Sequence, residues 1–344
     1  MTVLLADSFD LYADLADVTK SGWTWESANQ TFSTTNGRFG GGCLQNAVSN
    51  AGWRAPAIVA VGGTVIIAFA FYVSSRASGT ATDTVLTGYD RAGAQLFRLE
   101  MNTSGDLKAY NQPNSQVGST ASAVISDNAW HWIEVKVVLG TGAADGSIEV
   151  KLGGSTIIGP VTSIDTNNGN DLSFVYFAGS NGDSRFDDVI IMDVNGTGMN
   201  DFIGDSKIDV MIPNSDGSTT DWTASAGSDY QCVDDTPNAA NDDTDYVYAT
   251  SPNTTELQLS NFSDNPTTIH AVQVRTRSRK TDAGTRTYRA NILSGGSQGD
   301  GITMGLTTNY AWRRNGVFSR NPNGSVVWTK AAVNALQVEL ELLT

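Results

Sequence analysis

The chain has 344 residues, of which 40% are hydrophobic and 35 are glycine, and its formal net charge at pH 7 is −15. This length fits two domains better than one, and the apolar fraction argues against wholesale disorder. The acidic balance argues against a nucleic acid partner, because binding a duplex requires a basic face that displaces counterions. Abundant Gly, Ser, Thr and Asn favour short strands joined by tight turns, so we expect an all-β protein.

The first half of the chain contains short β-rich segments separated by turn residues. Strands are predicted over residues 64–74, 84–90, 94–101, 130–139, 147–152, 172–178 and 186–193. The first of these is apolar at nearly every position and is expected to be buried on both faces. The last two are expected to pair as a hairpin through Ser180–Asp183. This spacing is typical of a jelly-roll-like β-sandwich, which we expect over residues 1–198.

A polar, glycine-rich stretch at Asn195–Asp205 marks the expected domain boundary. Residues 199–344 are therefore expected to form a second β-sandwich domain, with a role in attachment or assembly. Two alternating segments predict strands there, at Ile269–Arg279 and Arg286–Leu293. Near the C-terminus we expect a short helix at Thr329–Leu336, with Thr329 as its N-cap, followed by a closing strand over residues 337–343.

Charge is unevenly distributed in this second half. From Asp201 to Asp264 there are 13 acidic residues against Lys207 alone, whereas residues 265–344 hold 10 basic residues against 4 acidic ones. Two interpretations stay open: the two regions pair within one fold, or they steer docking between protomers.

Motifs of the common enzyme classes are missing from the sequence. Nucleophilic triads need a histidine, and the only two, His131 and His270, lie at strand positions where a structural role is expected. Glu339 and Glu341 share one face of the terminal strand, where solvated alternation is expected rather than the facing pair of carboxylates that glycoside hydrolysis requires. There is no P-loop, dinucleotide fingerprint or metal-binding His or Cys spacing. We therefore predict that the protein is not an enzyme.

Candidate binding residues are few. Two acidic clusters offer the oxygen ligands that Ca²⁺ prefers, with solvated acidic loops as the alternative: Asp234, Asp235, Asp242, Asp243 and Asp245, and separately Asp183, Asp187 and Asp188. No other cofactor is expected. Trp23, Trp25 and Trp53 lie near predicted loops and are candidates for stacking on sugar rings, with burial in the core as the alternative.

The cysteines and the N-terminus bear on where the chain is made. Cys43 and Cys232 are 189 positions apart, so we expect two free thiols in a reducing cytoplasm. The start, Met1–Asp7, has no basic region ahead of a long apolar run. The longest apolar stretch, Val65–Val73, has about half the length of a spanning helix, so no membrane insertion is expected.

Several short motifs in the first half resemble a known family. The stretches that carry the resemblance are Asp7-Ser8-Phe9-Asp10, Gly22-Trp23, Gly37-Arg38-Phe39-Gly40-Gly41-Gly42, Trp130-His131 and Phe186-Asp187-Asp188-Val189-Ile190. They are similar to the opening, a central strand and the closing strand of concanavalin A-like, LamG-type lectin and glucanase modules. The resemblance covers about residues 1–195. In that family the turn at Arg38 and the strand at Phe186 are landmarks of the fold rather than catalytic motifs.

The second half resembles a region that follows such modules in virion proteins of tailed bacteriophages. It is carried by Asn200–Asp205, Trp222–Ser228, Arg279–Arg286 and Trp328–Leu336. The resemblance implies a non-enzymatic structural protein on the virion surface, made in the host cytoplasm, that decorates the capsid or tail. Adhesion to host surface glycans stays open as a further role.

The partners that the resemblance implies are copies of the chain, with a trimer expected, and the major capsid or tail proteins of the particle. Two alternatives stay open: a carbohydrate-binding adhesin or lectin module, and a glycan hydrolase, for which the fold has precedent but the sequence lacks the residues.

Overall fold

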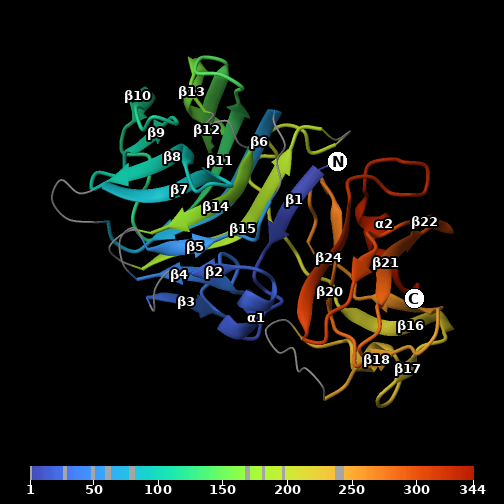
Figure 1. Cartoon of the computed structure of the whole chain (residues 1–344). Coiled ribbons are helices and arrows are strands. Elements are labelled where there is room, and N and C mark those ends of the chain that lie inside the picture. The colour runs from blue at the N-terminus through green and yellow to red at the C-terminus, as the bar shows by residue number, and fades with distance from the viewer. Residues whose placement is uncertain are drawn as a thin grey trace. The chain divides into compact units, whose positions relative to one another are not determined.

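The computed structural model describes residues 2–25, 29–47, 51–58, 63–76, 82–166, 171–179, 183–195, 198–236, 244–262 and 264–344. The protein is nearly all β, as predicted (Figure 1). The chain forms two compact units: unit 1 comprises Met1–Asp10 and Asp14–Ile208, and unit 2 comprises Leu11–Ala13 and Asp209–Thr344. Cys43 and Cys232 are free and buried, which confirms the prediction for the thiols.

Unit 1 is a sandwich of two antiparallel sheets. The eight-stranded sheet has the order β13-β12-β11-β6-β15-β4-β3, with β1 paired to β15. Its strands are β1 (Thr2–Asp7), β3 (Gln30–Ser33), β4 (Cys43–Asn46), β6 (Gly63–Val73), β11 (Ala129–Leu139), β12 (Gly146–Leu152), β13 (Ser155–Ile164) and β15 (Ser184–Asp193).

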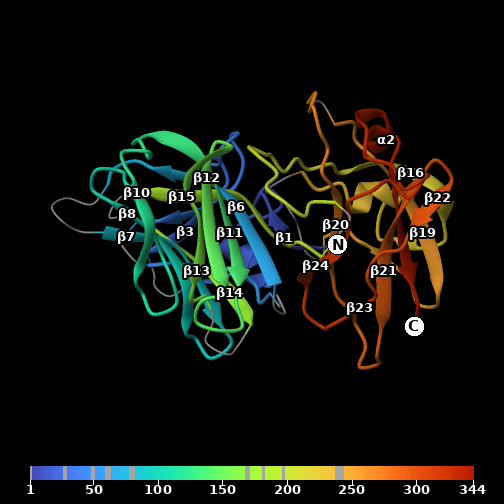
Figure 2. The ribbon, with the colours of Figure 1, turned by 90° about the horizontal axis from the view of Figure 1, so that it is seen from above.

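The seven-stranded sheet of unit 1 has the order β10-β9-β8-β7-β14-β5-β2. Its strands are β2 (Thr24–Trp25), β5 (Gly52–Arg54), β7 (Thr82–Asp90), β8 (Gln95–Asn102), β9 (Leu107–Tyr110), β10 (Gln116–Ala121) and β14 (Leu172–Ala178). Figure 2 separates β7, β8 and β10 of this sheet from β6, β11 and β12 of the other. The short helix α1 (Leu15–Lys20) begins after Asp14, whose carboxylate accepts the N–H of Asp17 at 2.9 Å.

Aromatic side chains join the two sheets of unit 1. The ring of Phe177 on β14 lies 5.4 Å from Phe69 on β6 and 5.5 Å from Phe186 on β15, and all three side chains are fully buried. Such edge-to-face contacts add to the free energy gained by burying the rings. The core of unit 1 therefore lies between the sheets.

The expected hairpin between residues 172–178 and 186–193 does not form. Strand β14 pairs with β5 and β7 of the seven-stranded sheet, whereas β15 pairs with β1, β4 and β6 of the other. The connection therefore crosses from one sheet to the other, so that Phe177 and Phe186 meet across the core instead of side by side. The prediction was wrong because an Asn-Gly turn signal is local and does not specify which strands pair. Ser180–Gly182 themselves lie outside the described residues.

Residues Met199–Ile208, here called the strap, belong to unit 1, although the predicted boundary placed them in the second domain. The strap is held on the outer face of the eight-stranded sheet by a buried carboxylate. Oε1 of Glu134 accepts the N–H of Ile203 at 2.8 Å and the N–H of Gly204 at 3.2 Å. Composition located a polar, glycine-rich segment correctly but could not show that its backbone is bound by a side chain of β11.

Unit 2 contains a six-stranded sheet of order β16-β19-β25-β21-β22, with β23 paired to β21, and two two-stranded sheets, β17-β18 and β20-β24. The strands are β16 (Pro213–Thr220), β17 (Thr223–Ala224), β18 (Val247–Tyr248), β19 (Asn253–Leu259), β20 (Val272–Ser278), β21 (Thr287–Ser294), β22 (Ser297–Gly299), β23 (Met304–Gly305), β24 (Ala311–Phe318) and β25 (Gln337–Leu342). A 3₁₀ turn, η1, spans Tyr230–Cys232.

The predicted C-terminal helix and closing strand are confirmed. Helix α2 (Lys330–Asn334) follows Thr329, whose hydroxyl accepts the N–H of Ala332 at 3.2 Å, and β25 comes next. Val333 of α2 is buried in one cluster with Val338 and Leu340 of β25. Within the described ranges, no helix has both the length and the apolar character needed to cross a membrane.

A buried amide organises the solvent-side face of β21 and β25. The amide nitrogen of Asn291 donates to Glu339 at 2.8 Å and to Glu341 at 3.0 Å, and its Oδ1 accepts the N–H of Gly301 at 2.9 Å. Glu341 also pairs with Arg289 at 2.6 Å. These two glutamates are thus structural ligands of an amide and not a pair open to substrate.

Replacing Asn291 by alanine is expected to lower the free energy of unfolding of unit 2 by about 2–3 kcal/mol, because three hydrogen bonds are lost at a fully buried position. The change in unfolding free energy is measured by urea denaturation, with hydrogen exchange of the β25 amides as the probe. Gln298→Ala, which removes an exposed amide bonded to Asp300, is the control and should change stability by less than about 0.5 kcal/mol. Equal effects of the two variants would contradict the structural role of Asn291.

Candidate functional site

A row of five side chains crosses the seven-stranded sheet on the face turned away from the core. Strand register places Arg54 beside Tyr176, Tyr176 beside Thr87, Thr87 beside Arg98, and Arg98 beside Tyr110. We call these residues the Arg98 row. They come from β5, β14, β7, β8 and β9, which are consecutive in the sheet.

The alternation of strand side chains explains why this row faces outward. The adjacent row, Phe177, Leu86 and Leu99, is buried between the sheets. Successive side chains on a strand point to opposite faces, so the residues next to these three point away from the core. Within the Arg98 row, Arg54 is exposed, Arg98 and Tyr110 are half-buried, and Thr87 and Tyr176 in the middle are buried.

Aromatic rings support the two guanidinium groups. Cζ of Arg54 lies 3.8 Å from the centroid of Phe174, which itself stacks on Tyr89 at 5.0 Å. Cζ of Arg98 lies 4.8 Å from the centroid of Tyr110. A guanidinium that stacks by its face directs its N–H groups along its edge, where they can bind a planar anion in a bidentate manner.

A carboxylate and an ammonium complete the polar surface beside Arg98. Glu100 pairs with Arg98 at 2.6 Å and lies opposite Lys108 in the register of β8 and β9. Burial and the hydrogen bond that Tyr110 donates to Glu100 raise the pKa of the Tyr110 hydroxyl, so this group keeps its proton at neutral pH. Arg54, Arg98 and Lys108 supply three cations to this face, with Glu100 paired to Arg98 and Asp106 close enough to Lys108 for that ammonium to lower its pKa.

The three candidate tryptophans lie elsewhere in unit 1. Trp23 and Trp53 are fully buried, and their indole N–H groups donate to Asp7 at 3.0 Å and to the carbonyl of Gln45 at 3.1 Å. Neither can present a ring face to a ligand. Trp25 is 37% exposed at the edge strand β2 and packs on Trp53 with a centroid distance of 5.8 Å.

The acidic cluster of Asp183, Asp187 and Asp188 has local partners. Asp183 pairs with Arg185, and Oδ2 of Asp187 accepts the N–H of Arg38 at 2.7 Å. Oδ1 of Asp188 accepts the N–H of Ile208 at 2.8 Å. Asp187 and Asp188 therefore tie the turn at Arg38 and the end of the strap to β15, which matches the role of fold landmarks.

The second acidic cluster can be placed only in part. Asp242 and Asp243 lie outside the described residues, whereas Asp234, Asp235 and Asp245 lie in loops of unit 2. Over the ranges that the structure describes, no three His, Cys, Asp or Glu side chains gather in a way that could hold a metal ion.

Comparison with known proteins yields no family and only distant structural matches. No family model matches the chain, and no curated protein matches it. Among solved structures, the protein named cellulose induced protein Cip1 has 16% identity and a TM-score of 0.40, covering 54% of this chain and 96% of its own. An endo-β-1,4-glucuronan lyase from the fungus Trichoderma reesei has 14% identity and a TM-score of 0.40, covering 55% and 95%. An alginate lyase from a Chlorella virus has 14% identity and a TM-score of 0.38, covering 55% and 99%.

These matches correct two predictions. The matched structures include polysaccharide lyases, which overturns both the prediction that the protein is not an enzyme and the prediction of a purely structural virion protein. The bacteriophage part of the resemblance has no support among these matches. The error has a physical basis: the motifs behind the resemblance hold β15 and the turn at Arg38 together, so they report on the fold and not on the chemistry of the sheet faces.

Proposed function

We propose that unit 1 binds an acidic polysaccharide along the Arg98 row and cleaves it. The observation that carries the proposal is the alignment of two ring-supported guanidinium groups on one outward sheet face. Arginine binds carboxylates in a bidentate manner, and aromatic rings stack on the apolar faces of sugars. A chain of sugars that carry carboxylates meets both preferences.

Cleavage by β-elimination breaks the bond between C4 and the glycosidic oxygen, forms a C4=C5 double bond and moves the C5 proton to the departing oxygen. Glu100 can take the C5 proton while Tyr110, which is hydrogen-bonded to it, gives its own proton to that oxygen and is reprotonated by Glu100. The Tyr110 hydroxyl holds its proton at neutral pH, and it lies next to Arg98, which would bind the sugar carboxylate. Glu100, which accepts the hydrogen bond of Tyr110, holds the hydroxyl in place. Positioned acids of this kind contribute about 10²–10⁴-fold to rate.

Two variants separate binding from chemistry. Arg98→Ala should weaken binding of alginate or polyglucuronate by about tenfold or more, because a charge-assisted bidentate contact is lost. Tyr110→Phe should keep that affinity within about threefold and lower the rate of cleavage by about 100-fold or more. Binding is measured by calorimetry and cleavage by the release of new chain ends.

Matched controls come from the same hairpin and from unit 2. Arg91→Ala removes an exposed arginine in the turn between β7 and β8, and Tyr246→Phe alters an exposed tyrosine, so both should behave as the unaltered protein. Unchanged binding by Arg98→Ala would contradict the proposed face. Binding without cleavage by the unaltered protein would contradict the catalytic role of Tyr110.

A further inference from the structure

A second row of polar and aromatic side chains crosses the other sheet of unit 1, on its outer face. Register places Thr31 beside Gln45, Gln45 beside Arg185, Arg185 beside Tyr72, and Tyr72 beside Trp130. We call these residues the Trp130 row. They belong to β3, β4, β15, β6 and β11, which are consecutive in the sheet. With about 4.8 Å between neighbouring strands, the row is roughly 19 Å long.

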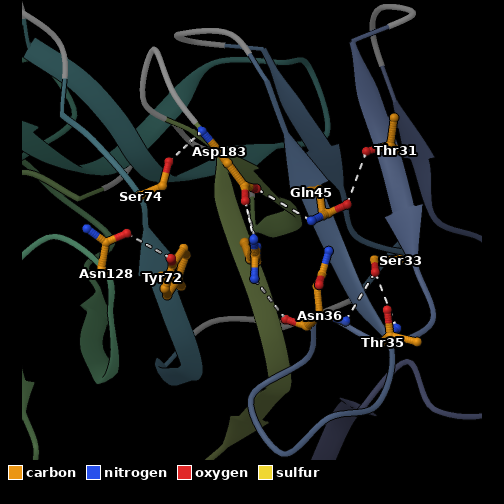
Figure 3. Close-up of polar contacts among 10 residues, drawn as sticks. Thr31, Ser33, Thr35, Asn36, Gln45, Tyr72, Ser74, Asn128 and Asp183 are labelled. Atoms are coloured by element: carbon orange, nitrogen blue, oxygen red, sulfur yellow. Dashed lines mark hydrogen bonds and ion pairs between the residues drawn. The ribbon is translucent and has the colours of Figure 1, made fainter.

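The polar side chains of the Trp130 row are fixed by hydrogen bonds. Figure 3 shows Asp183 between Ser74 and Gln45, with Thr31 on the strand beyond. Oδ2 of Asp183 accepts a hydrogen bond from the Nε–H of Arg185 at 2.9 Å and another from its Nη2. The guanidinium is therefore held at a set position and orientation.

The aromatic half of the row is continuous with the polar half. Cζ of Arg185 lies 4.6 Å from the centroid of Tyr72, and Tyr72 lies 5.5 Å from Trp130. The hydroxyl of Tyr72 donates to Oδ1 of Asn128 at 3.1 Å. Tyr72 and Trp130 are both half-buried, so part of each ring lies at the surface of the sheet.

The strap leaves this row uncovered. On the same face of the sheet the strap is bound at Glu134 of β11 and Asp188 of β15. Ala70 of β6 pairs with Trp132 on one side and with Asp187 on the other. The Trp130 row lies beyond this level of the sheet, on the side away from Glu134 and Asp188. The row thus lies on a part of this face that the contacts of the strap with Glu134 and Asp188 do not reach.

Charge separates this row from the Arg98 row. Arg185 is the only cation in the Trp130 row and is paired with Asp183, whereas the Arg98 row holds two arginines, Arg54 and Arg98, with Lys108 beside them. A neutral, hydroxyl-rich ligand fits the Trp130 row better than an anion does. Amide and guanidinium groups bind adjacent hydroxyls, and the two rings offer stacking surface.

We propose that the Trp130 row is a second carbohydrate site, specific for a neutral oligosaccharide, on the opposite sheet from the acidic polysaccharide site. It would hold a short stretch of sugar rings, with one ring stacked on Trp130 and Tyr72 and the hydroxyls of the next bound by Arg185 and Gln45. The site requires no contribution from the Arg98 row.

The test uses the full-length protein with cellohexaose, laminarihexaose and mannohexaose, each titrated by calorimetry. At least one is expected to bind, and Trp130→Ala should weaken that binding by about tenfold or more, since the principal stacking surface is removed. Arg98→Ala should leave it unchanged. Tyr246→Ala, which removes an exposed aromatic side chain of unit 2, is the matched control, and circular dichroism verifies the fold of each variant.

Three results would overturn this proposal: no binding of any of the three hexasaccharides, equal binding by Trp130→Ala and the unaltered protein, or equal loss in Trp130→Ala and Arg98→Ala. A Trp130→Ala variant that alters self-association in light scattering, with no change in sugar binding, would also overturn it and assign the row to contact between copies. None of these results depends on whether acidic polysaccharides bind.

Discussion

Unit 1 is expected to lose about 2–3 kcal/mol of stability, or roughly 5–10 °C in melting temperature, when the pH rises from 5 to 8. The cause is a set of carboxyl groups buried beneath the strap and the turn at Arg38. Burial, followed by the charge of Asp188, raises the pKa of Asp187 from 3.8 to about 8. Burial raises the pKa of Asp188 to about 7, and burial also raises the pKa of Glu134.

The sign follows from proton binding in the two states. Each of these groups has a higher pKa in the folded chain than in the unfolded chain, so the folded state holds more protons between the two values. The stabilising contribution is complete below about pH 4 and is lost as the pH rises through about 7–8. Arg38 and Lys207 lower the pKa of Asp188 and offset part of this effect, whereas Asp10 raises it.

Hydrogen exchange of β6 amides as a function of pH reports the global stability of unit 1 after correction for intrinsic exchange rates. Asp188→Asn, which cannot ionise, should flatten the dependence because one of the two most shifted carboxyl groups no longer titrates. Stability that rises between pH 5 and pH 8, or an unchanged slope in Asp188→Asn, would contradict this assignment.

Replacing Phe177 by alanine is expected to destabilise unit 1 by about 3–5 kcal/mol, a large share of the typical stability of a domain, about 5–15 kcal/mol. Phe177 is fully buried and contacts Phe69, Phe186 and Trp23, so the variant leaves a cavity where the two sheets meet. Thermal unfolding followed by tryptophan fluorescence measures the loss.

The control is Phe174→Ala on the same strand, because Phe174 faces away from the core and is only half-buried. Its cost should be at least about 2 kcal/mol smaller than that of Phe177→Ala. Similar costs for the two variants would mean that the sandwich core is not where these rings place it.

Local patterns in the sequence predicted the elements well. The double burial of β6 follows from its unbroken apolar run, since Ala68 and Ala70 face the side opposite Phe69 and Phe71 and are equally buried. Thr329 was recognisable as an N-cap from its position ahead of a short apolar segment. Pairing was less predictable, because the turn between β14 and β15 carries a hairpin signal although its strands belong to different sheets.

The candidate site could not be found from the sequence either, because the pairing of strands that assembles it is not visible in local patterns. Arg54, Arg98 and Tyr176 are far apart along the chain, and each taken alone is an ordinary outward residue of an alternating strand. Only the register of consecutive strands brings them into one row. Trp23, Trp25 and Trp53 were predicted to stack on sugars because of their residue type, yet Trp23 and Trp53 are core residues held by indole hydrogen bonds.

The central claim, that acidic polysaccharide binds along the Arg98 row, is tested most directly by the arginine side-chain signals in nuclear magnetic resonance. Guanidinium Nε–H signals are recorded while a uronate hexasaccharide is added to isotope-labelled protein. We expect the signals of Arg54 and Arg98 to shift with saturation and that of Arg91 to stay unchanged. Saturable shifts confined to Arg185 or to the arginines of unit 2, with Arg54 and Arg98 unaffected, would contradict the account.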